Sequence, residues 1–225
     1  MHYISSMVKF DTKQVDFNLE GVPISIHRIT NVSALMDAFI ARDPEDELFR
    51  DERFPYWADL WHSAIGLGRY LVQSKFIQKG TRVTELGCGL GFSGIVAGKL
   101  GAAVTFTDYL REPLDFAKQN WELNCTNDAQ YELMDWRNPK PALAAELILA
   151  ADVAYEERSF DPLRKTFDQL YQPNGKIIIS EPNRKRTVPF IQALAVDGWQ
   201  IEKTVLKEHL DAFTATVNIF TLQRA

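Results

Sequence analysis

Hydrophobic and polar residues follow two periods along this chain. Short apolar runs rich in β-branched residues predict buried strands, and apolar residues that return every three or four positions predict helices. The strand candidates are residues 82–86, 103–107, 130–133, 146–150 and 176–180. The helix candidates between them are residues 93–100, 111–123 and 159–171, with Pro173-Asn174-Gly175 as a turn before the fifth strand. This alternation predicts a mostly parallel α/β sheet with helices on both faces.

Both ends of the chain depart from the alternation. Residues 13–19 and 22–30 flank Glu20-Gly21, which predicts a β-hairpin, and Ser33 is placed to cap a short helix that ends at Ile40. Near the C-terminus, β-forming residues predict an antiparallel strand pair, with a short helical piece between the strands. These three segments are residues 199–206, 207–211 and 214–223. The expected fold is a Rossmann-like, mostly parallel seven-stranded sheet with helices on both faces, an antiparallel C-terminal pair and an N-terminal β-hairpin extension.

The charged stretch at residues 42–54 separates the N-terminal extension from the rest of the chain. It holds six acidic and three basic residues, so we interpret it as an exposed connector or helix face, with contact to a substrate as the alternative. Helical spacing then runs over residues 56–72. We therefore expect an extension at residues 1–55 and a main domain at residues 56–225, together forming one compact unit.

Composition narrows the possible partners and compartment. The net charge of −5 argues against broad attraction to nucleic acid, and Arg184-Lys185-Arg186 is the one compact basic run. No apolar stretch has the length of a membrane span, and residues 1–10 lack the apolar region of a secretory signal. Cys88 and Cys125 share no metal or redox spacing, and the four histidines are scattered. We expect a cytoplasmic protein without a metal site.

A glycine-rich turn at residues 83–94 carries the main chemical signal. A strand followed by glycines and an apolar helix brings the backbone and a helix N-terminus close to a ligand. Gly89-x-Gly91-x-x-Gly94 matches the dinucleotide fingerprint, and Asp108 follows at the distance of a ribose-binding acid. Glu85-x-Gly87-x-Gly89-x-Gly91 matches a different cofactor loop. The turn by itself fits both.

Glu85 favours the second loop. A carboxylate at the end of a buried strand is costly unless it meets a cation or several donors, and NAD offers no cation there. S-adenosylmethionine carries an ammonium group, so Glu85 suits its methionine end, the backbone of 87–91 its middle and Asp108 its ribose. Asp135 and Trp136 follow the third strand and suit the adenine amino group and ring, with a turn acid and an anchoring aromatic residue as the alternative.

These motifs together resemble the class I S-adenosylmethionine-dependent methyltransferases. The resemblance rests on VTELGCGLG at 83–91, FTD ending at Asp108, MDW ending at Trp136 and the final strand pair. A narrower resemblance, to seven-β-strand methyltransferase family 16, rests on the Trp61 segment and on Asp152-x-x-Tyr155, and it covers about residues 13–223. Characterised members of that branch are mainly protein lysine methyltransferases. The chain departs from the family pattern at His62 and at residues 181–184, a region that usually touches the acceptor.

The resemblance implies an S-adenosylmethionine-dependent N-methyltransferase that acts on a protein lysine. A small amine acceptor, a NAD-dependent oxidoreductase and a non-catalytic cofactor-binding module are the alternatives. Asp152 is expected to accept a hydrogen bond from the acceptor nitrogen and Tyr155 to line the acceptor channel, with a helix cap and core packing as their structural alternatives. Tyr56 and Trp57 are candidates for further aromatic lining.

The family pattern also assigns a set of cofactor contacts. Cys88 is expected to contribute through its backbone, and Trp61 to pack near the cofactor. The expected cofactor residues are Trp61, Glu85, Gly87, Cys88, Gly89, Gly91, Asp108, Tyr109, Asp135, Trp136 and Ala151. The expected partner is a protein substrate, with a small amine as the alternative, and neither nucleic acid nor a membrane is expected.

Overall fold

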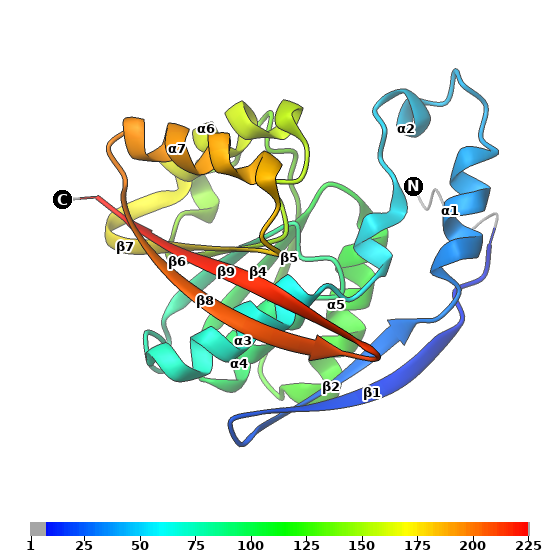
Figure 1. Ribbon diagram of the computed structural model, residues 1–225. Coiled ribbons are helices and arrows are strands. Elements are labelled where there is room, and N and C mark those ends of the chain that lie inside the picture. Colours follow the sequence, from blue (N-terminus) through cyan, green and yellow to red (C-terminus); the bar gives the residue numbers. More distant parts are fainter. Residues whose placement is uncertain (1–7, 225) are drawn as a thin grey trace.

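A computed structural model describes residues 8–224 and places a seven-stranded sheet at the centre of the protein (Figure 1). Its strands are β3 (Arg82–Leu86), β4 (Ala103–Asp108), β5 (Gln130–Leu133), β6 (Ala145–Ala151), β7 (Tyr171–Glu181), β8 (Gln200–Leu210) and β9 (Phe213–Gln223). They lie in the order β5-β4-β3-β6-β7-β9-β8, and β9 runs antiparallel to both of its neighbours. The predicted fold class is confirmed.

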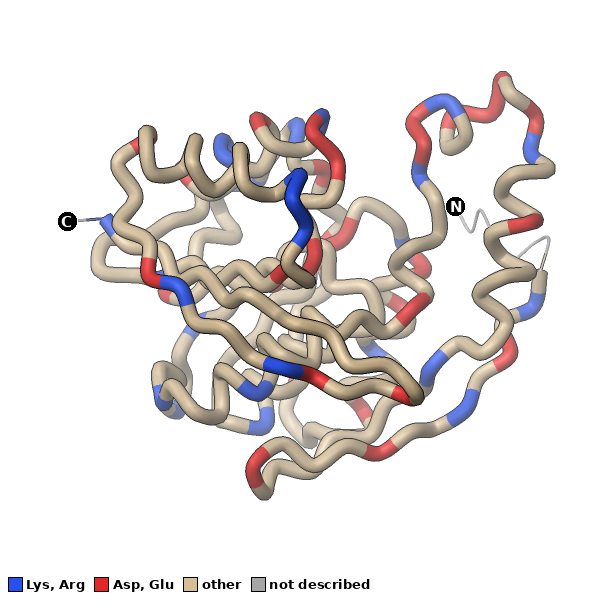
Figure 2. The backbone as a smooth tube through the Cα atoms, viewed as in Figure 1, with Lys and Arg blue, Asp and Glu red and all other residues tan. Residues whose placement is uncertain are grey.

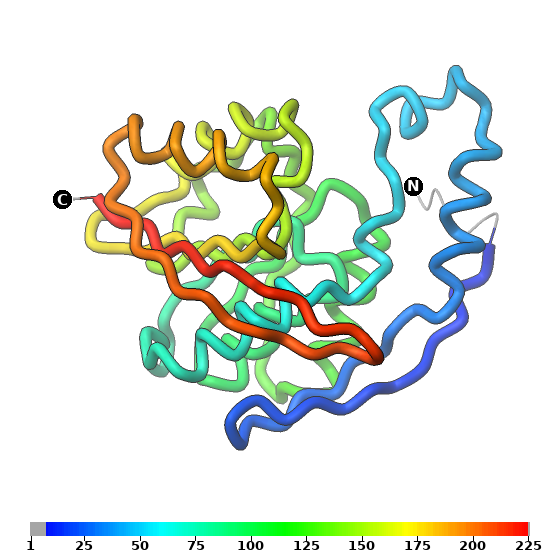
Figure 3. Tube along the Cα trace, viewed as in Figure 1, coloured from blue at the N-terminus to red at the C-terminus, as the bar shows by residue number. Residues whose placement is uncertain are grey.

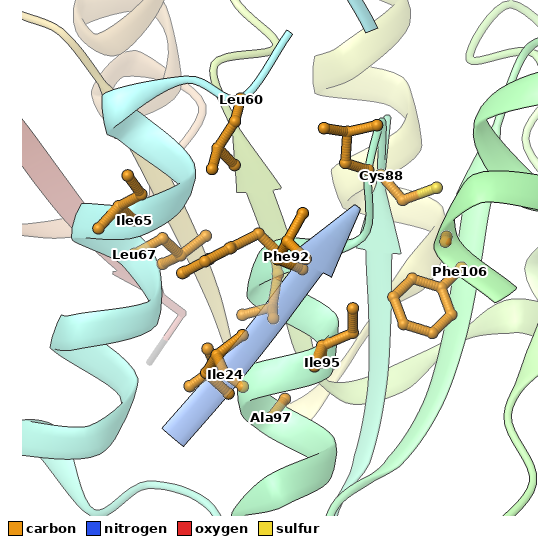
Figure 4. Close-up of a cluster of buried hydrophobic side chains, with 14 of the residues drawn as sticks. Ile24, Leu60, Ile65, Leu67, Cys88, Phe92, Ile95, Ala97 and Phe106 are labelled. Atoms are coloured by element: carbon orange, nitrogen blue, oxygen red, sulfur yellow. The ribbon is translucent and has the colours of Figure 1, made fainter. Parts of the chain in front are cut away.

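Five helices cover the two faces of the sheet. One face packs against α3 (His62–Ser74), α4 (Phe92–Lys99) and α5 (Arg111–Asn124), and the other against α6 (Phe160–Leu170) and α7 (Val188–Val196). Figure 4 shows the first core, where Phe92 and Ile95 of α4 lie near Leu67 of α3 and Ile24 of the extension. Each such fully buried side chain contributes about 1.5–3 kcal/mol to folding.

The N-terminal extension packs along the α5 side of the sheet domain (Figure 3). Its elements are β1 (Thr12–Leu19), β2 (Val22–Ile29), α1 (Val32–Ile40), α2 (Glu47–Arg50) and the 3₁₀ helix η1 (Pro55–Ala58). The hairpin β1–β2 is antiparallel, as predicted. Asn124 and Asn120 of α5 accept the backbone N–H groups of Ser25 and His27 at 2.8 and 2.7 Å, so side chains replace the strand that β2 lacks on this edge. Residues 1–7 of the expected extension lie outside the described range.

The C-terminal strand pair is longer than the sequence indicates. The helical piece expected at residues 207–211 is wrong, because β8 continues to Leu210 and pairs with β9 throughout. Glu208 points inward from β8 with its side chain 1% exposed, and it accepts hydrogen bonds from Arg69 of α3 at 2.7 and 3.1 Å. A buried glutamate obscures the alternation that marks a strand, and only its partner on α3 explains it.

Two helix starts also differ from expectation. Asn31, not Ser33, occupies the N-cap position of α1, and its side chain instead bonds the backbone of Asp11 and Lys9 before β1. The helix expected over 56–72 is divided, because Asp59 and Trp61 adopt extended backbone between η1 and α3. The Trp61 indole N–H donates to the Tyr56 carbonyl at 2.9 Å and holds this corner.

The segment after β7 holds an element that the sequence pattern did not predict. Helix α7 follows the 3₁₀ turn η4 (Lys185–Thr187). Two other 3₁₀ turns lie earlier in the main domain, η2 (Pro141–Leu143) and η3 (Glu157–Ser159). Pro173-Asn174-Gly175 lies within β7 as an irregularity, with Asn174 in the left-handed region at φ 64° and a register shift between Ala145 and Leu147 of β6.

The strand order reverses its direction between β3 and β6. From β3 the chain builds outward through β4 to β5, and it then returns to build β6 and β7 on the other side. In open α/β sheets such a switch point leaves a crevice at the carboxyl ends of the strands. Among residues 8–224, none of the helices combines the length and hydrophobicity needed to span a bilayer.

Candidate active site

A cavity of about 1000 Å³ lies at the carboxyl ends of the parallel strands. Residues that follow β3, β4, β5, β6 and β7 line it, together with part of the extension from Asp51 to Trp61. Twelve of the thirteen predicted site residues line this one cavity, namely Trp61, Glu85, Gly87, Cys88, Gly89, Asp108, Tyr109, Asp135, Trp136, Ala151, Asp152 and Tyr155. Gly91 is the exception, because it faces the protein interior behind the turn.

Glycines 91 and 94 serve the packing of the turn. Gly91 has φ 81° at the start of α4, and a Cβ there would lie 2.9 Å from the Ala117 side chain of α5. At Gly94 a Cβ would lie 2.4 Å from the Phe106 ring and 2.6 Å from Oε2 of Glu85. These contacts are shorter than any real Cβ contact, so both positions require glycine for close approach of helix to strand.

Glu85 is a buried carboxylate surrounded by neutral donors. It is 2% exposed, and Oε2 accepts the backbone N–H of Gly94 at 3.0 Å. Burial raises the pKa of Glu85 to about 8, against the opposing effect of the hydrogen bonds from Gly94 and Ser93. Among residues 8–224, no lysine or arginine forms a salt bridge with it. A cationic group in the cavity would therefore supply the positive charge that this carboxylate lacks.

Asp108 ends β4 beside the same turn. Its Oδ2 accepts the Gly89 N–H at 3.2 Å and its Oδ1 accepts the Leu110 N–H at 3.3 Å. Burial raises the pKa of Asp108 to about 6, and these backbone donors oppose that shift. The carboxylate is thus held by backbone while it still faces the cavity, which suits hydrogen bonding to ligand hydroxyl groups.

Residues 51–54 of the extension close one side of the cavity. Asp51 accepts two hydrogen bonds from Arg137, each at 3.0 Å, and one from Tyr109 at 3.2 Å. The Arg53 guanidinium lies 3.6 Å from the centroid of the Tyr109 ring, a cation–π contact. We call this set (Asp51, Arg53, Tyr109 and Arg137) the latch, because it ties the extension to the loops after β4 and β5.

Asp135 and Trp136 lie in the loop after β5. Asp135 accepts from Arg137 Nε at 2.8 Å, and although burial alone would raise the pKa of Asp135, Arg137 holds it below its usual value. The Trp136 ring lies against Gly87, where a Cβ would approach it to 3.1 Å. The loop thus brings an ionised carboxylate and an indole ring to the Gly87 side of the cavity.

Asp152 follows β6 at the opposite side of the cavity from the latch loops. It adopts φ 56° and is 9% exposed. Arg184 Nη1 donates to Oδ1, Arg184 Nη2 donates to Oδ2 at 3.3 Å, and the Ser63 hydroxyl donates to Oδ2 at 3.2 Å. Burial raises the pKa of Asp152, and Arg184 and Ser63 oppose the shift.

Aromatic side chains line the same cavity. Tyr155 meets Tyr56 of the extension edge to face at 5.7 Å, and burial raises the pKa of Tyr155 to about 12. Trp61 lies 6.0 Å from the Arg184 guanidinium. Trp57 also lines the cavity and contacts Phe116 at 5.8 Å. Aromatic side chains together with a carboxylate suit a ligand that has an aliphatic stem and an amine.

The predicted site residues did not include Arg184 or, from the latch, Asp51, Arg53 and Arg137, which all line the cavity. Arg184 belongs to the basic run at 184–186 (Figure 2, in blue just before α7). The run follows the fifth parallel strand, and this position in the sequence is the signal that could have indicated a place in the cavity. The sequence indicates an exposed connector or helix face at residues 42–54, with contact to a substrate as the alternative, and the structure places 51–54 in the wall of the cavity. In the described part of the chain, no cluster of three or more His, Cys, Asp or Glu is suited to a metal ion.

The fold and the cavity define an S-adenosylmethionine-dependent methyltransferase of class I. The family described as Lysine methyltransferase matches residues 50–196, and this chain belongs to that family. It is similar to the Protein N-lysine methyltransferase METTL21A of Mus musculus, with 33% identity over 74% of this chain and 77% of the relative. The METTL21A of Danio rerio is 37% identical over 55% of this chain and 59% of the relative.

Solved structures agree on the fold. Magnesium protoporphyrin IX methyltransferase from Synechocystis, with bound S-adenosylmethionine, superposes with a TM-score of 0.59 at 16% identity, over 88% of this chain and 98% of that one. The residues present here fit the cofactor by their own chemistry. Glu85 offers a buried carboxylate without a cation. Gly87 and Gly89 bring the backbone of the turn to the cavity at φ 61° and 51°, where a Cβ would lie 3.1 Å from the Trp136 ring and from the Trp57 carbonyl oxygen, respectively.

Proposed function

We propose that this enzyme transfers the methyl group of S-adenosylmethionine to the side-chain nitrogen of a lysine in a protein substrate. The observation that carries the proposal is that one cavity has carboxylates with different surroundings at its two ends. Glu85 and Asp108 are bonded to backbone N–H groups of the glycine turn, whereas Asp152 is bonded to Arg184 and Ser63 and is followed by Tyr155, which lines the same cavity. One end suits a cofactor with an ammonium group and a ribose, and the other suits an amine on an aliphatic stem.

At the cofactor end we assign each residue a contact. Glu85 binds the ammonium of the methionine part, and the backbone at Gly87, Cys88 and Gly89 follows its middle. Asp108 binds the ribose hydroxyls. The adenine is held by Asp135 and Trp136, and the side walls are Trp61, Tyr109 and Ala151, which all line the cavity. Gly91 supports this arrangement from behind the turn.

At the acceptor end Asp152 accepts a hydrogen bond from the lysine nitrogen and directs its lone pair toward the methyl carbon. Tyr155 and Tyr56 enclose the aliphatic stem and the charged nitrogen of substrate or product. S-adenosylmethionine supplies a methyl group that is already activated on a sulfonium. The protein therefore contributes mainly alignment, an effect that reaches about 7–11 kcal/mol in favourable cases.

The acceptor nitrogen must be neutral when it reacts, because an ammonium has no lone pair. Lysine has an ordinary pKa of about 10.4, so its proton has to leave before transfer. The nitrogen lone pair then forms the new bond to the methyl carbon, and the carbon–sulfur bond breaks with its electron pair on sulfur. The product is a methylammonium, which loses its extra proton to solvent.

The surfaces that select the protein substrate surround the acceptor end. We assign them to the extension at residues 1–55, which forms one compact unit with the main domain at 56–225, and to the loops after β6 and β7. Support comes from Glu52, Glu156 and Arg158, which meet at the rim through the hydrogen bonds of Arg158. We place the enzyme in the cytoplasm, in keeping with the free Cys88 and Cys125 thiols.

Radiolabelled methyl transfer tests the proposal. The protein is incubated with methyl-labelled S-adenosylmethionine and a heat-treated extract of cells that lack this gene. We expect a labelled protein band whose acid hydrolysate contains methyllysine, and we expect S-adenosylhomocysteine to suppress it. Label in small molecules alone would support an amine acceptor, and methylhistidine or methylarginine in the hydrolysate would contradict the lysine assignment.

A further inference from the structure

The carboxylate that we assign to the acceptor already has a cationic partner. Arg184 bonds both oxygens of Asp152, and Ser63 bonds Oδ2 as well. The Asp152 side chain is only 7% exposed and that of Arg184 is 28% exposed, so the pair lies largely out of water. A buried pair of this kind needs further hydrogen bonds to offset the loss of hydration, and here Arg184 and Ser63 together donate three to Asp152.

The fold holds Arg184 in this position. Its backbone N–H donates to Glu181 Oε2 at 2.6 Å, and Glu181 is itself 2% exposed. Asn183 before it adopts φ 58° and accepts from Asn218 of β9 at 3.1 Å. The loop after β7 is thus fixed by buried polar contacts, and the guanidinium is directed into the cavity beside Trp61.

The other charged groups around Asp152 do not replace Arg184. Glu181 lies behind the pair and adds negative charge. Arg158 is bonded to Glu156 and to Glu52. The remaining charged groups that line the cavity are Asp51, Arg53, Asp59, Glu85, Asp108, Asp135, Arg137, Lys185 and Arg186. Within residues 8–224, Arg184 is the cation that forms a salt bridge with Asp152.

This pairing changes what Asp152 can do to an amine. A lone carboxylate stabilises an ammonium beside it and so keeps the proton that the reaction must lose. A carboxylate balanced by a guanidinium has little net charge to offer. Its two oxygens accept about four hydrogen bonds, and Arg184 and Ser63 use three, so one acceptor position remains for an N–H of the substrate.

We propose that Arg184 is a positioning residue that balances the charge of Asp152, so that the acceptor nitrogen binds to Asp152 as a neutral amine. This inference rests on the proposed function for the identity of the acceptor. Without Arg184, the pair formed by Asp152 and the amine holds one proton more than in the wild type, either on the carboxylate or on the nitrogen. That proton has to leave before the nitrogen can react.

The first test is the pH dependence of methyl transfer to the labelled band by the wild type, Arg184→Gln and Arg184→Lys. The rate should increase with pH, and in Arg184→Gln we expect the midpoint of this increase to lie at least about one pH unit higher than in the wild type. Near neutral pH this shift corresponds to a rate about tenfold lower. The substitution should lower kcat and leave KM unchanged or lower. The difference in kcat from the wild type should disappear as pH rises. Arg184→Lys should keep the wild-type profile.

A matched control separates this effect from a loss of structure. Arg164 also forms a bidentate ion pair, with Asp197 at 2.7 Å for both bonds, away from the cavity. Arg164→Gln should leave the profile in place. A loss in Arg184→Gln by the same factor at every pH would overturn the inference and leave Arg184 a structural role.

The second test needs no protein substrate. The probe is n-butylamine, a mimic of the lysine side chain, added to the full chain with S-adenosylhomocysteine and followed by NMR. The wild type should bind it more tightly as pH rises and the neutral amine forms. Arg184→Gln should bind the ammonium at neutral pH at least about tenfold more tightly than the wild type.

The two tests fail in different ways. Suppose that the wild type makes no methyllysine, while the wild type and Arg184→Gln bind butylamine with the expected difference in pH dependence. In that case the proposed function fails and the role of Arg184 stands. If methyllysine forms but butylamine binding has the same pH dependence in both proteins, the role of Arg184 is overturned. Absence of butylamine binding to both proteins also overturns it.

Discussion

The two ends of the cavity are built in different ways. At the cofactor end, Glu85 and Asp108 are held by backbone N–H groups of the glycine turn and its neighbours, and no salt bridge within residues 8–224 reaches them. At the acceptor end, Asp152 is held by side chains, among them Arg184 from a loop 32 residues further along the chain. The cofactor end thus depends on local backbone shape, whereas the acceptor end depends on long-range partners.

This difference shows which charge each end accepts. A buried carboxylate without a cation favours a ligand that brings one, because the ligand restores the ionised form. A carboxylate that already has its cation favours a neutral donor. On our proposal, the same residue type therefore prepares one end for the charged part of a cofactor and the other for an uncharged amine.

The sharpest way to separate the two ends is Asp152→Asn. It replaces one carboxylate oxygen, and so removes a hydrogen-bond acceptor for the substrate nitrogen and the ionic partner of Arg184, but it leaves the glycine turn untouched. Turnover should therefore fall about 100-fold or more while affinity for S-adenosylhomocysteine is kept. Labelled methyl transfer and isothermal titration measure the two quantities. Asp161→Asn, at an exposed salt bridge on α6, is the control. Full activity of Asp152→Asn would refute the acceptor role.

Asp108→Asn should give the reverse result. It weakens hydrogen bonds between an ionised carboxylate and ligand hydroxyls, each worth about 1.5–3 kcal/mol, so affinity for S-adenosylhomocysteine should fall about 10- to 100-fold. At saturating cofactor the turnover should stay close to that of the wild type. Titration calorimetry with Asp128→Asn as an exposed control checks this. Unchanged affinity would remove Asp108 from the cofactor end.

The pH dependence of folding tests the state of Glu85. Its pKa is raised from 4.5 to about 8 in the folded protein, so the folded state binds more protons than the unfolded state between these values. The stability from this group is present below pH 4.5 and is lost as pH rises through about 8. The melting temperature of ligand-free Glu85→Gln should therefore change less over that pH range than the melting temperature of the wild type. Parallel melting curves would contradict the raised pKa.

The latch should give the smallest effect. Arg137 is 47% exposed, and exposed ion pairs contribute about 0.2–1 kcal/mol. Asp51→Asn should therefore weaken binding of S-adenosylhomocysteine by no more than about fivefold. The difference should shrink at high salt because exposed charges are screened. An effect that survives high salt would show that Asp51 contacts the ligand directly.

Local patterns were enough to predict the elements that form the glycine-turn side of the cavity. The strand, glycine turn and helix at 82–100 are short-range features, and the alternation of strands and helices placed the loops after β3, β4, β5 and β6 at one edge of the sheet. Asp152 and Tyr155 entered through the family pattern, and both line the cavity. Their predicted contacts await the experiments above.

Long-range partners were not predictable from one sequence. Arg184 appeared as part of a basic run, and nothing local indicates that it pairs with Asp152. The latch depends on Asp51 meeting Arg137 across 86 positions. Likewise the end of β8 was not predicted, because Glu208 interrupts its hydrophobic alternation. The arginine that pairs with this glutamate, Arg69, lies on another element.

The Arg69–Glu208 ion pair has a consequence for the open edge of the sheet. Strand β8 is an edge strand, and its outer backbone groups resemble a template on which another chain can form a strand. An inward glutamate fixes the register of β8, since a slip by one residue would turn Glu208 outward and point Lys207 or His209 toward the core. We expect Glu208→Val to be more prone to aggregation, even though it removes a buried charge.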